Sequence, residues 1–515
     1  MNAALVSGVL LAGEVPAQAP VCTTWYPTGS SLGARVEATA SVDFGSGPRL
    51  VACGPFLSIG GAGTPLVAQW DGSAWSSVGA TFTGSGFTRV EEVATVDLGA
   101  GPRVVAGGSF DHVGGAPASG VAIWDGTTWS GLGSGLSLQG GVGIGEVAAT
   151  FDDGTGTKLY VGGQFDAAGG IATNSIAAWD GSAWSALGSG LRGGFFTSFV
   201  IALAVFDDGN GPALYAAGNF LDAGGVPVGN VARWDGASWS NVGGGLGSFG
   251  NVVHALQVFD DGGGPALYAA GSVTGGIQRF DGSSWSQVGA GFDSPAFSLA
   301  VFDDGSGAAL YAGGFFTHSG STVVRHLGRW DGSAWSDVGS FVDDTVVDLG
   351  THAWNGVSAL VVAGDFDLSA SGEAKLALYG HGPCPPYTVV QGCAGNTAHL
   401  SFPSAPASIG TTVFTTLVTD VVQDGLAATF YGERAVDVAG CGASLPGVGD
   451  VLVADLRAPT AIPLVAVTNG AALVPLAVPA NPAIGGVRAK VQSVAVDPGS
   501  WVAELATGLL VTVYP

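Results

Sequence analysis

The chain has 515 residues, of which 89 are glycine and 25 are proline, and only 11% of the residues are charged. Glycine at about every sixth position opposes long helices, which excludes a helical bundle. The 47% of apolar residues supplies enough material for a large core and excludes global disorder. A formal charge of −25 repels phosphate backbones and anionic lipids, so we expect no nucleic-acid partner.

Two apolar stretches need separate interpretation. Residues 458–487 carry no charge, but prolines interrupt them repeatedly, so we expect short strands and turns rather than a membrane span. Residues 3–13 are apolar and precede Ala17-Gln18-Ala19, which has the small-x-small pattern of a signal-peptidase site. A basic region before them is missing. Residues 1–19 nevertheless predict a secretory leader, and thus a secreted or cell-surface protein, with an N-terminal strand or a frayed tail as the alternative.

A repeat of about 50 residues organises most of the remaining chain. Trp-Asp-Gly recurs with spacings of 46 to 55 residues, at Trp70, Trp124, Trp179, Trp234 and Trp330, with Phe280 replacing Trp once and Tyr379 closing the series. Within one unit, residues 146–187, four apolar runs are separated by Asp-Gly and Gly-Gly turns. This pattern therefore predicts that each unit forms four short strands, in a sheet that is covered on both faces.

Seven such units can be counted. Their first strands are expected to begin near Val36, Val90, Glu146, Val200, Val252, Phe297 and Thr345. The last unit lacks its own Trp strand, while a strand around Trp25 precedes the first unit without partners. We expect the Trp25 strand to complete the last sheet. Residues 22–382 would then form a seven-bladed, four-stranded β-propeller that is closed by the N-terminal strand.

At these residues the chain resembles the kelch and galactose-oxidase-type β-propeller family. The resemblance rests on Leu159-Tyr160, Gly162-Gly163, Trp179-Asp180-Gly181 and Trp184, and on their counterparts in most units. Phe-Asp-Asp-Gly, as at Phe151, is similar to a repeat variant of secreted bacterial proteins. The resemblance implies a fold and does not assign a function. It does not carry over the copper chemistry of the oxidase, because the tyrosines here occupy a repeated, core-like position.

The composition changes after Tyr379, where a proline cluster begins at Pro383. Residues 387–515 contain short strand-like runs with Gly and Pro punctuation and no helical period, which predicts a β-sandwich domain, either Ig-like or jelly-roll-like. Cys22 lies just before the first repeat and Cys384 just after the last, while Cys393 and Cys441 lie in the C-terminal part. We expect disulfides between Cys22 and Cys384 and between Cys393 and Cys441, and a buried thiol at Cys53, although sequence alone does not fix the connectivity.

Alignment of the units brings a set of glutamates to one position. Six residues before the first Asp that follows strand one, the units carry Glu37, Glu91, Glu146, Ile201, His254, Phe297 and Val342. Innermost strands of a propeller line its axis, so three carboxylates are expected at one axial level, with His254 across the ring. Such a group could act as acid and base or hold a cation, or it could be simply solvated at an exposed mouth.

The aspartates of the turns form a second set. A first Asp ends strand one in each unit, with Asp348 assigned to the seventh, and four units double it: Asp152 with Asp153, Asp207 with Asp208, Asp260 with Asp261, and Asp303 with Asp304. These oxygen-rich loops raise a calcium hypothesis. Adjacent residues on a strand end point to opposite sides, however, so a hairpin turn is the favoured interpretation and no cofactor is required. An acidic rim could also serve solubility or attract a basic partner.

The favoured function is extracellular binding or assembly, in which the loop face around the axis takes a glycan, a peptide or a protein. Aromatic residues outside the repeat pattern are the candidates for this surface: Phe87, Phe195, Phe196 and Phe249. One alternative is a hydrolase or lyase that acts on polysaccharides, with Glu37, Glu91 and Glu146 as acid and base groups and His254 assisting. Another is a structural subunit of an envelope layer or filament that self-assembles through its C-terminal domain.

Overall fold

The computed structural model describes residues 21–28, 32, 34–56, 66–193, 198–248, 250–338, 342–354, 356–366 and 375–383, and several short strands between residues 399 and 504. All the regular elements in these ranges are β-strands, and the fold class is all-β, as the sequence predicts. The described residues therefore include no helix that could cross a membrane. The chain divides into two units, Trp25–His381 and the remaining residues.

Seven four-stranded antiparallel sheets make up the described part of Trp25–His381 that carries the repeat. Sheet 1 contains β2 (Ala38–Asp43), β3 (Pro48–Cys53), β4 (Val67–Trp70) and β5 (Trp75–Ser77). Sheet 2 contains β7 (Arg89–Asp97), β8 (Pro102–Ser109), β11 (Val121–Trp124) and β12 (Trp129–Gly131). Sheet 3 contains β15 (Ile144–Asp152), β16 (Thr157–Gln164), β19 (Ile176–Trp179) and β20 (Trp184–Ala186). The remaining four sheets repeat this order.

Sheet 4 contains β22 (Phe199–Asp207), β23 (Pro212–Asn219), β26 (Val231–Trp234) and β27 (Trp239–Asn241). Sheet 5 contains β28 (Val253–Asp260), β29 (Pro265–Gly271), β30 (Ile277–Phe280) and β31 (Trp285–Gln287). Sheet 6 contains β32 (Ala296–Asp303), β33 (Ala308–Gly314), β36 (Leu327–Trp330) and β37 (Trp335–Asp337). Sheet 7 contains β38 (Val346–Trp354), β39 (Val357–Gly364), β40 (Leu376–Pro383) and β1 (Val21–Pro27).

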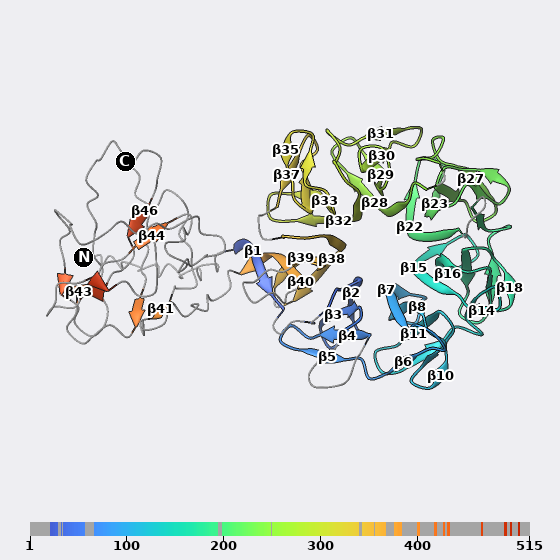
Figure 1. The fold of residues 1–515 in the computed structure, drawn as a ribbon, viewed down its shortest axis with the longest axis horizontal. Coiled ribbons are helices and arrows are strands. Elements are labelled where there is room, and N and C mark those ends of the chain that lie inside the picture. The colour runs from blue at the N-terminus through green and yellow to red at the C-terminus, as the bar shows by residue number, and fades with distance from the viewer. Residues whose placement is uncertain are drawn as a thin grey trace, which may run out of the picture. The chain divides into compact units, whose positions relative to one another are not determined.

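The first strands of the sheets lie side by side in chain order. Each of β2, β7, β15, β22, β28, β32 and β38 contacts the next, and β38 in turn contacts β2 (Figure 1). The last sheet takes its outer strand from the start of the chain, because β1 pairs with β40. The Trp25 and Tyr379 rings lie 5.2 Å apart between centroids. The two ends of the repeat region therefore meet in one sheet.

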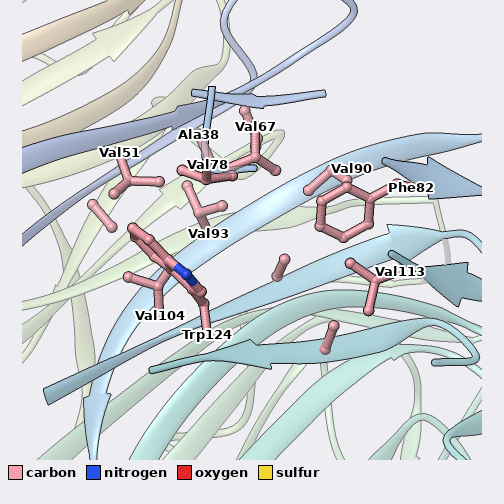
Figure 2. Close-up of a cluster of buried hydrophobic side chains, with 14 of the residues drawn as sticks. Ala38, Val51, Val67, Val78, Phe82, Val90, Val93, Val104, Val113 and Trp124 are labelled. Carbon is pink, nitrogen blue, oxygen red and sulfur yellow. The ribbon is translucent and has the colours of Figure 1, made fainter. Parts of the chain in front are cut away.

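Apolar side chains fill the space between successive sheets. Figure 2 shows the cluster between sheets 1 and 2, where Val51 and Val67 face Val93, Val104 and Trp124. The second strand of each sheet is a nearly continuous apolar run because neighbouring sheets cover both of its faces, as in β23, where every residue after Pro212 is buried. Each fully buried valine or leucine contributes about 1.5–3 kcal/mol of hydrophobic stabilisation.

The repeated tryptophans connect each sheet to the one before it. In the hairpin between strands three and four, Trp234 lies opposite Trp239. The indole Nε1 of Trp239 donates to the carbonyl oxygen of Leu187, next to sheet 3, at 2.8 Å. Trp184, Trp285 and Trp335 make the corresponding bond to Leu132, Val242 and Val288. Because these rings are packed between sheets, they serve the fold.

A β-bulge near the start of strand one recurs from sheet to sheet. In sheet 4 the register shifts between Val200 and Ala202, so that Ile201 is the extra residue. Opposite the bulge lies Gly218, and a Cβ atom at this position would overlap the carbonyl oxygen of Phe199. The glycine is thus required because two backbones approach closely.

Short strands extend the connections between the main strands. Their sheets consist of β6 (Phe82–Thr83), β9 (His112–Val113) and β10 (Ala116–Pro117); β13 (Leu136–Leu138), β14 (Gly141–Val142), β17 (Ala167–Ala168) and β18 (Ile171–Ala172); β21 (Leu191–Arg192), β24 (Asp222–Ala223) and β25 (Val226–Pro227); and β34 (His318–Ser319) and β35 (Thr322–Val323). They join the segment before strand one to the loop between strands two and three.

The region after His381 contributes only short strands to the described residues: β41 (His399–Ser401), β42 (Leu417–Thr419), β43 (Leu426–Ala427), β44 (Phe430–Gly432), β45 (Val465–Ala466), β46 (Ala489–Val491), β47 (Ala495–Val496) and β48 (Ala503–Glu504). They pair as β41 with β42, as β44 with β46, and in the order β45-β43-β47-β48. Most of the predicted sandwich, and the predicted leader, lie outside the described residues.

The bulge glycine gives a direct test of the backbone packing. Replacing Gly218 with alanine forces a methyl group against the Phe199 carbonyl, and we expect the free energy of unfolding to fall by about 1–3 kcal/mol. Gly141→Ala is the matched control, since that glycine has ordinary space around its Cβ position, and a change within about 0.5 kcal/mol is expected. Denaturant titration measures both. Equal effects of the two substitutions would contradict the close approach.

Candidate functional site

The bulge positions define the candidate site. The extra residues are Glu91, Glu146, Ile201, His254, Phe297 and Val347 in sheets 2 to 7. In sheet 1 Glu37 takes the corresponding place just before β2, where its N–H donates to the Cys53 carbonyl. We call the end of the sheets at which strand one begins the entry end, and the opposite end, which carries the Asp turns, the turn end.

The seventh unit corrects the sequence alignment. The prediction placed Val342 at the glutamate position and Asp348 in the turn. In the structure Val347 is the bulge residue of β38, and Asp348 follows it inside the strand, paired with Ala363. Strand β38 ends with His352, Ala353 and Trp354, where the first strands of the other sheets end in an aspartate. Asp348 was misassigned because the last unit lacks this aspartate, so a nearby Asp was taken for it.

Glu37, Glu91 and Glu146 influence one another at the entry end. Glu37 forms an ion pair with Arg35 at 3.0 Å, and Glu91 with Arg89 at 2.9 Å. Both arginines lie two residues before their glutamate. Glu146 has no such arginine, and its Oε2 atom is buried without a hydrogen-bond donor in the described part of the chain. The charge of Glu37 acts on Glu91 and that of Glu91 acts on Glu146, but the three carboxyl groups differ in their partners.

Burial and neighbouring charges raise the pKa values of Glu91 and Glu146. Burial, followed by the charge of Glu91, raises the pKa of Glu146 to about 8, because the nearby Arg89 only partly compensates. Burial also raises the pKa of Glu91, while Arg89 lowers it and Glu37 adds to the rise. The Glu146 carboxyl group therefore holds a proton at neutral pH, whereas Glu37 and Glu91 form ion pairs with arginine.

The other side of the entry end is apolar at the same level. Ile201, Phe297 and Val347 replace glutamate there, and the His254 ring meets the Phe297 ring edge-on at 5.0 Å between centroids. Burial lowers the pKa of His254 to about 4, so this imidazole is neutral at pH 7. His254 therefore packs against an aromatic ring and is not brought together with the three glutamates. The bulge residues form an acidic half and an apolar half.

Of the predicted aromatic candidates, the structure describes Phe87. It lies between β6 and β7, and 80% of its surface is exposed. Phe195, Phe196 and Phe249 lie outside the described residues. The pattern did not single out Phe315, which follows β33 and is 56% exposed. Exposed aromatic residues of this kind can serve binding.

The turn aspartates have local hydrogen-bond partners. The first Asp of a turn accepts bonds from two glycine N–H groups, as Asp207 does from Gly209 and Gly211 at 2.9 and 3.0 Å. Asp152, Asp260 and Asp303 do the same in their sheets. The Asp of Trp-Asp-Gly behaves alike, since Asp180 accepts from the N–H groups of Ser182 and Ala183. These are turn contacts, as the hairpin interpretation predicts.

The second aspartate of each doubled turn faces its own sheet. Asp208 accepts a bond from the Tyr215 hydroxyl at 2.9 Å and pairs with Arg233 at 3.3 Å. Asp261 and Asp304 bind a tyrosine and an arginine in the same way, and Asp153 binds Tyr160 and Lys158. In the described part of the chain no group of three or more His, Cys, Asp or Glu has metal-binding geometry. Calcium at these turns stays a prediction.

Two further carboxyl groups, those of Asp348 and Glu92, lie deeper between sheets 7, 1 and 2. The alignment of the repeat units did not assign either of them to this place. Asp348 Oδ2 accepts bonds from the Thr39 N–H at 2.8 Å and from its hydroxyl at 2.6 Å. Glu92 follows the bulge on β7, and burial together with the charge of Asp348 raises its pKa well above the usual range. Their signal in the sequence is that Glu92 and Asp348 occupy the same position of their strands, immediately after the bulge.

The cysteine predictions are described only in part. Cys53 is a buried free thiol on β3, as expected. Burial, followed by the charge of Glu92, raises its pKa well above the usual range, so it is not a reactive thiolate. Cys22 lies on β1, but Cys384, Cys393 and Cys441 lie outside the described residues. Both disulfides therefore stay predictions.

Comparisons with known proteins give no family. No family model and no curated protein matches the chain. Among solved structures the chain is similar to the extracellular domain of a protein described as a hybrid two-component system of B. thetaiotaomicron, with 11% identity, a TM-score of 0.41, and coverage of 72% of this chain and 40% of that one. Another is described as the extracellular domain of a one-component system of the same organism, with 10% identity, a TM-score of 0.28, and coverage of 73% and 62%. The chain spans less than two thirds of either structure.

The raised pKa of Glu146 predicts a pH effect on stability. The folded state holds the proton of Glu146 up to about pH 8, whereas the ordinary value is 4.5, so ionisation of this group destabilises the fold as the pH rises between these values. Glu146→Gln removes this loss. We expect the variant to equal the wild type below pH 4.5 and to exceed its free energy of unfolding by more than about 1 kcal/mol at pH 8.

Denaturant titrations between pH 4 and pH 9 measure this difference. Asp97→Asn is the control: it removes one negative charge from the turn end of β7, and its side-chain oxygen can still accept the bonds from Gly99 and Gly101. Its difference from the wild type should not follow the profile of Glu146→Gln. A difference for Glu146→Gln that is independent of pH would contradict the raised pKa.

Proposed function

We propose that residues 22–382 form a seven-bladed β-propeller of kelch-like type, in which each of the seven sheets is a blade. Three observations support it. The first strands contact one another in chain order, β38 contacts β2, and the N-terminal strand β1 completes the last sheet. The resemblance of the repeat residues to the kelch and galactose-oxidase-type family agrees with this arrangement.

We further propose that the chain is a secreted or cell-surface protein that binds a glycan, a peptide or a protein at its entry end. One observation carries this proposal: the bulge residues at that end are split into an acidic half and an apolar half. Glu37, Glu91 and Glu146 offer hydrogen-bond acceptors, and the apolar half offers Phe297 and His254 as flat surfaces. Such a combination suits a ligand that has both polar and apolar faces, as sugars and peptides do.

The constancy of the other repeat residues also favours a binding surface at the entry end. The strand-four tryptophans of sheets 3 to 6, the turn aspartates and the strand-two tyrosines make hydrogen bonds within the fold, as Trp239, Asp207 and Tyr215 do. The bulge residues differ from sheet to sheet and make few such contacts. Variation at one aligned position, on a framework that otherwise repeats, favours a binding surface there. Secretion is supported by the leader pattern in residues 1–19.

An enzyme that cleaves polysaccharides is the second candidate. The observation that favours it is the difference between Glu146, whose pKa is about 8, and its ion-paired neighbours. Glycosidases use one protonated and one ionised carboxyl group, and Glu146 would be the acid. Glu37 or Glu91 would then be the base or nucleophile. Binding is preferred because both of these are engaged by arginines.

The test is a binding screen with the full chain on arrays of polysaccharides, oligosaccharides and peptides, followed by titration of any ligand found. We expect Glu37→Gln and Phe87→Ala to weaken binding at least about tenfold, which corresponds to about 1.4 kcal/mol or more. Asp97→Asn, at the turn end, should leave the affinity unchanged. Equal affinity of all the variants would contradict a site at the entry end.

The same ligands distinguish the enzyme. Release of reducing ends or of unsaturated sugars, abolished by Glu146→Gln while binding remains, would replace the binding proposal by the enzyme proposal. Binding without release of products supports the first. If no array member binds and the chain forms defined oligomers that are lost on removal of residues 387–515, a structural role in assembly is favoured over both.

A further inference from the structure

Sheets 7, 1 and 2 line a cavity of about 340 Å³ that the proposed site does not include. Its wall includes Thr39 and Ser41 of β2, Glu92 and Thr95 of β7, and Gly350 and Thr351 of β38. These are the first strands of three neighbouring sheets, so the cavity lies along the inner strands, below the bulge level. Its volume is at the lower end of the range for small-molecule sites.

Glu92 is the one charged residue among those that line this cavity, and no lysine, arginine or histidine accompanies it there. Within the described part of the chain its carboxyl group has no hydrogen bond or ion pair, and the nearby charge of Asp348 repels it. Asp348, by contrast, is held by the N–H and hydroxyl groups of Thr39. A carboxylate that lacks a counter-ion in such a place is unfavourable, and it attracts a cation.

Two hydroxyl groups of the wall, those of Thr39 and Thr95, are oriented as acceptors. Thr39 donates its hydroxyl proton to Asp348, and Thr95 donates its own to the Ser41 carbonyl at 2.8 Å. Their oxygens keep lone pairs for a ligand but have no proton left to give. Together with Glu92 they present side-chain acceptors around one negative charge. The group that this arrangement complements is a positively charged donor of several hydrogen bonds.

We propose that this cavity binds a primary ammonium group, and that the ligand which carries it is an amino sugar of a glycan. An ammonium group supplies three N–H donors and one positive charge, which match Glu92 and the threonine oxygens. The hydroxyl groups of the same sugar can bond to the remaining lone pairs and to Thr351. The sugar assignment rests on the binding function proposed above, whereas the ammonium assignment rests on the cavity alone.

A metal ion fits this cavity less well. Calcium takes six to eight oxygen ligands, often from several carboxylates, and Glu92 is the one carboxylate in the lining. Asp348 does not line the cavity, and its Oδ2 already accepts two bonds from Thr39. An organic cation needs no such coordination shell. A proton on Glu92 offsets the cost of the lone carboxylate whenever no cation is bound, which agrees with the raised pKa of this group.

The experiment is isothermal titration of the full chain with four probes: a glucosamine tetramer, the N-acetylglucosamine tetramer, 1,4-diaminobutane and a tetralysine peptide. We expect the glucosamine tetramer to bind at least tenfold more tightly than its acetylated counterpart, because acetylation removes the charge and two of the three N–H donors. In Glu92→Gln this preference should disappear. Glu92→Asp, which keeps the charge, should retain part of it.

Controls separate a lost site from a lost fold. Near-ultraviolet circular dichroism and the melting temperature of each variant show whether it is folded, and Asp97→Asn should bind all four probes as the wild type does. If Glu92→Gln does not fold, Thr351→Val, which removes one wall hydroxyl at an exposed position, takes its place. A folded Glu92→Gln or Thr351→Val that binds the glucosamine tetramer as tightly as the wild type overturns the proposal.

The outcomes with the four probes distinguish a failure of this inference from a failure of the proposed function. Equal binding of both tetramers, unaffected by Glu92→Gln, overturns the ammonium site but leaves glycan binding at the entry end. Binding of the diamine that depends on Glu92, without binding of either tetramer, supports the ammonium site and overturns the amino sugar. Tight binding of tetralysine alone assigns the site to a protein side chain. Binding of no probe overturns both parts of the inference.

Discussion

Burial of every sheet on both faces is the constraint on which the rest of the repeat region depends. A four-stranded sheet of this kind is too short and too apolar to be stable alone, so each requires a neighbour on either side. The strand-four tryptophan also links each sheet to the preceding one, as when the Trp239 indole donates a hydrogen bond to the carbonyl oxygen of Leu187, next to sheet 3. The first and last sheets satisfy the same need through contact between β38 and β2 and through the pairing of β1 with β40.

This packing positions the candidate site. When the inner strands are held side by side, residues about 55 positions apart in the chain become neighbours, and Glu91 raises the pKa of Glu146. The bulge then sets the orientation of these side chains. Because it adds one residue that the partner strand does not match, the extra side chain is free of the alternation that governs the others. The candidate site is therefore built on a local irregularity of the sheet.

Much of the fold was predictable from local signals in the sequence. Asp-Gly turns and apolar runs predict the strands, and the four runs predicted within residues 146–187 correspond to β15, β16, β19 and β20. The approach of Trp25 to Tyr379 followed from counting strands. The alignment of the seventh unit was wrong because β38 ends in Ala353-Trp354 and offers no Asp-Gly turn. Val342 was therefore aligned with the glutamates in place of Val347. The bulge leaves no mark that counting could detect.

The site was predictable to a lesser degree. The aligned glutamates could be found by position, but Arg35 and Arg89 could not, because their role depends on side chains that fold back over two residues. His254 was expected to assist a carboxylate and instead packs on Phe297. Glu92 was not noticed, and Asp348 was assigned to a turn, because the two lie in different sheets and their proximity appears in no repeated phrase. Pairing across sheets is information that only the three-dimensional arrangement contains.

The bulge has an evolutionary consequence. Its glycine partner and the surrounding tryptophans fix the framework, while the side chain at the bulge itself is glutamate, isoleucine, histidine, phenylalanine or valine in the same molecule. The indole bonds, the turn contacts and the bulge glycines that hold the sheets together involve other residues. If the entry end binds a ligand as proposed, point substitutions at the bulge positions change what it recognises without any insertion in the repeat.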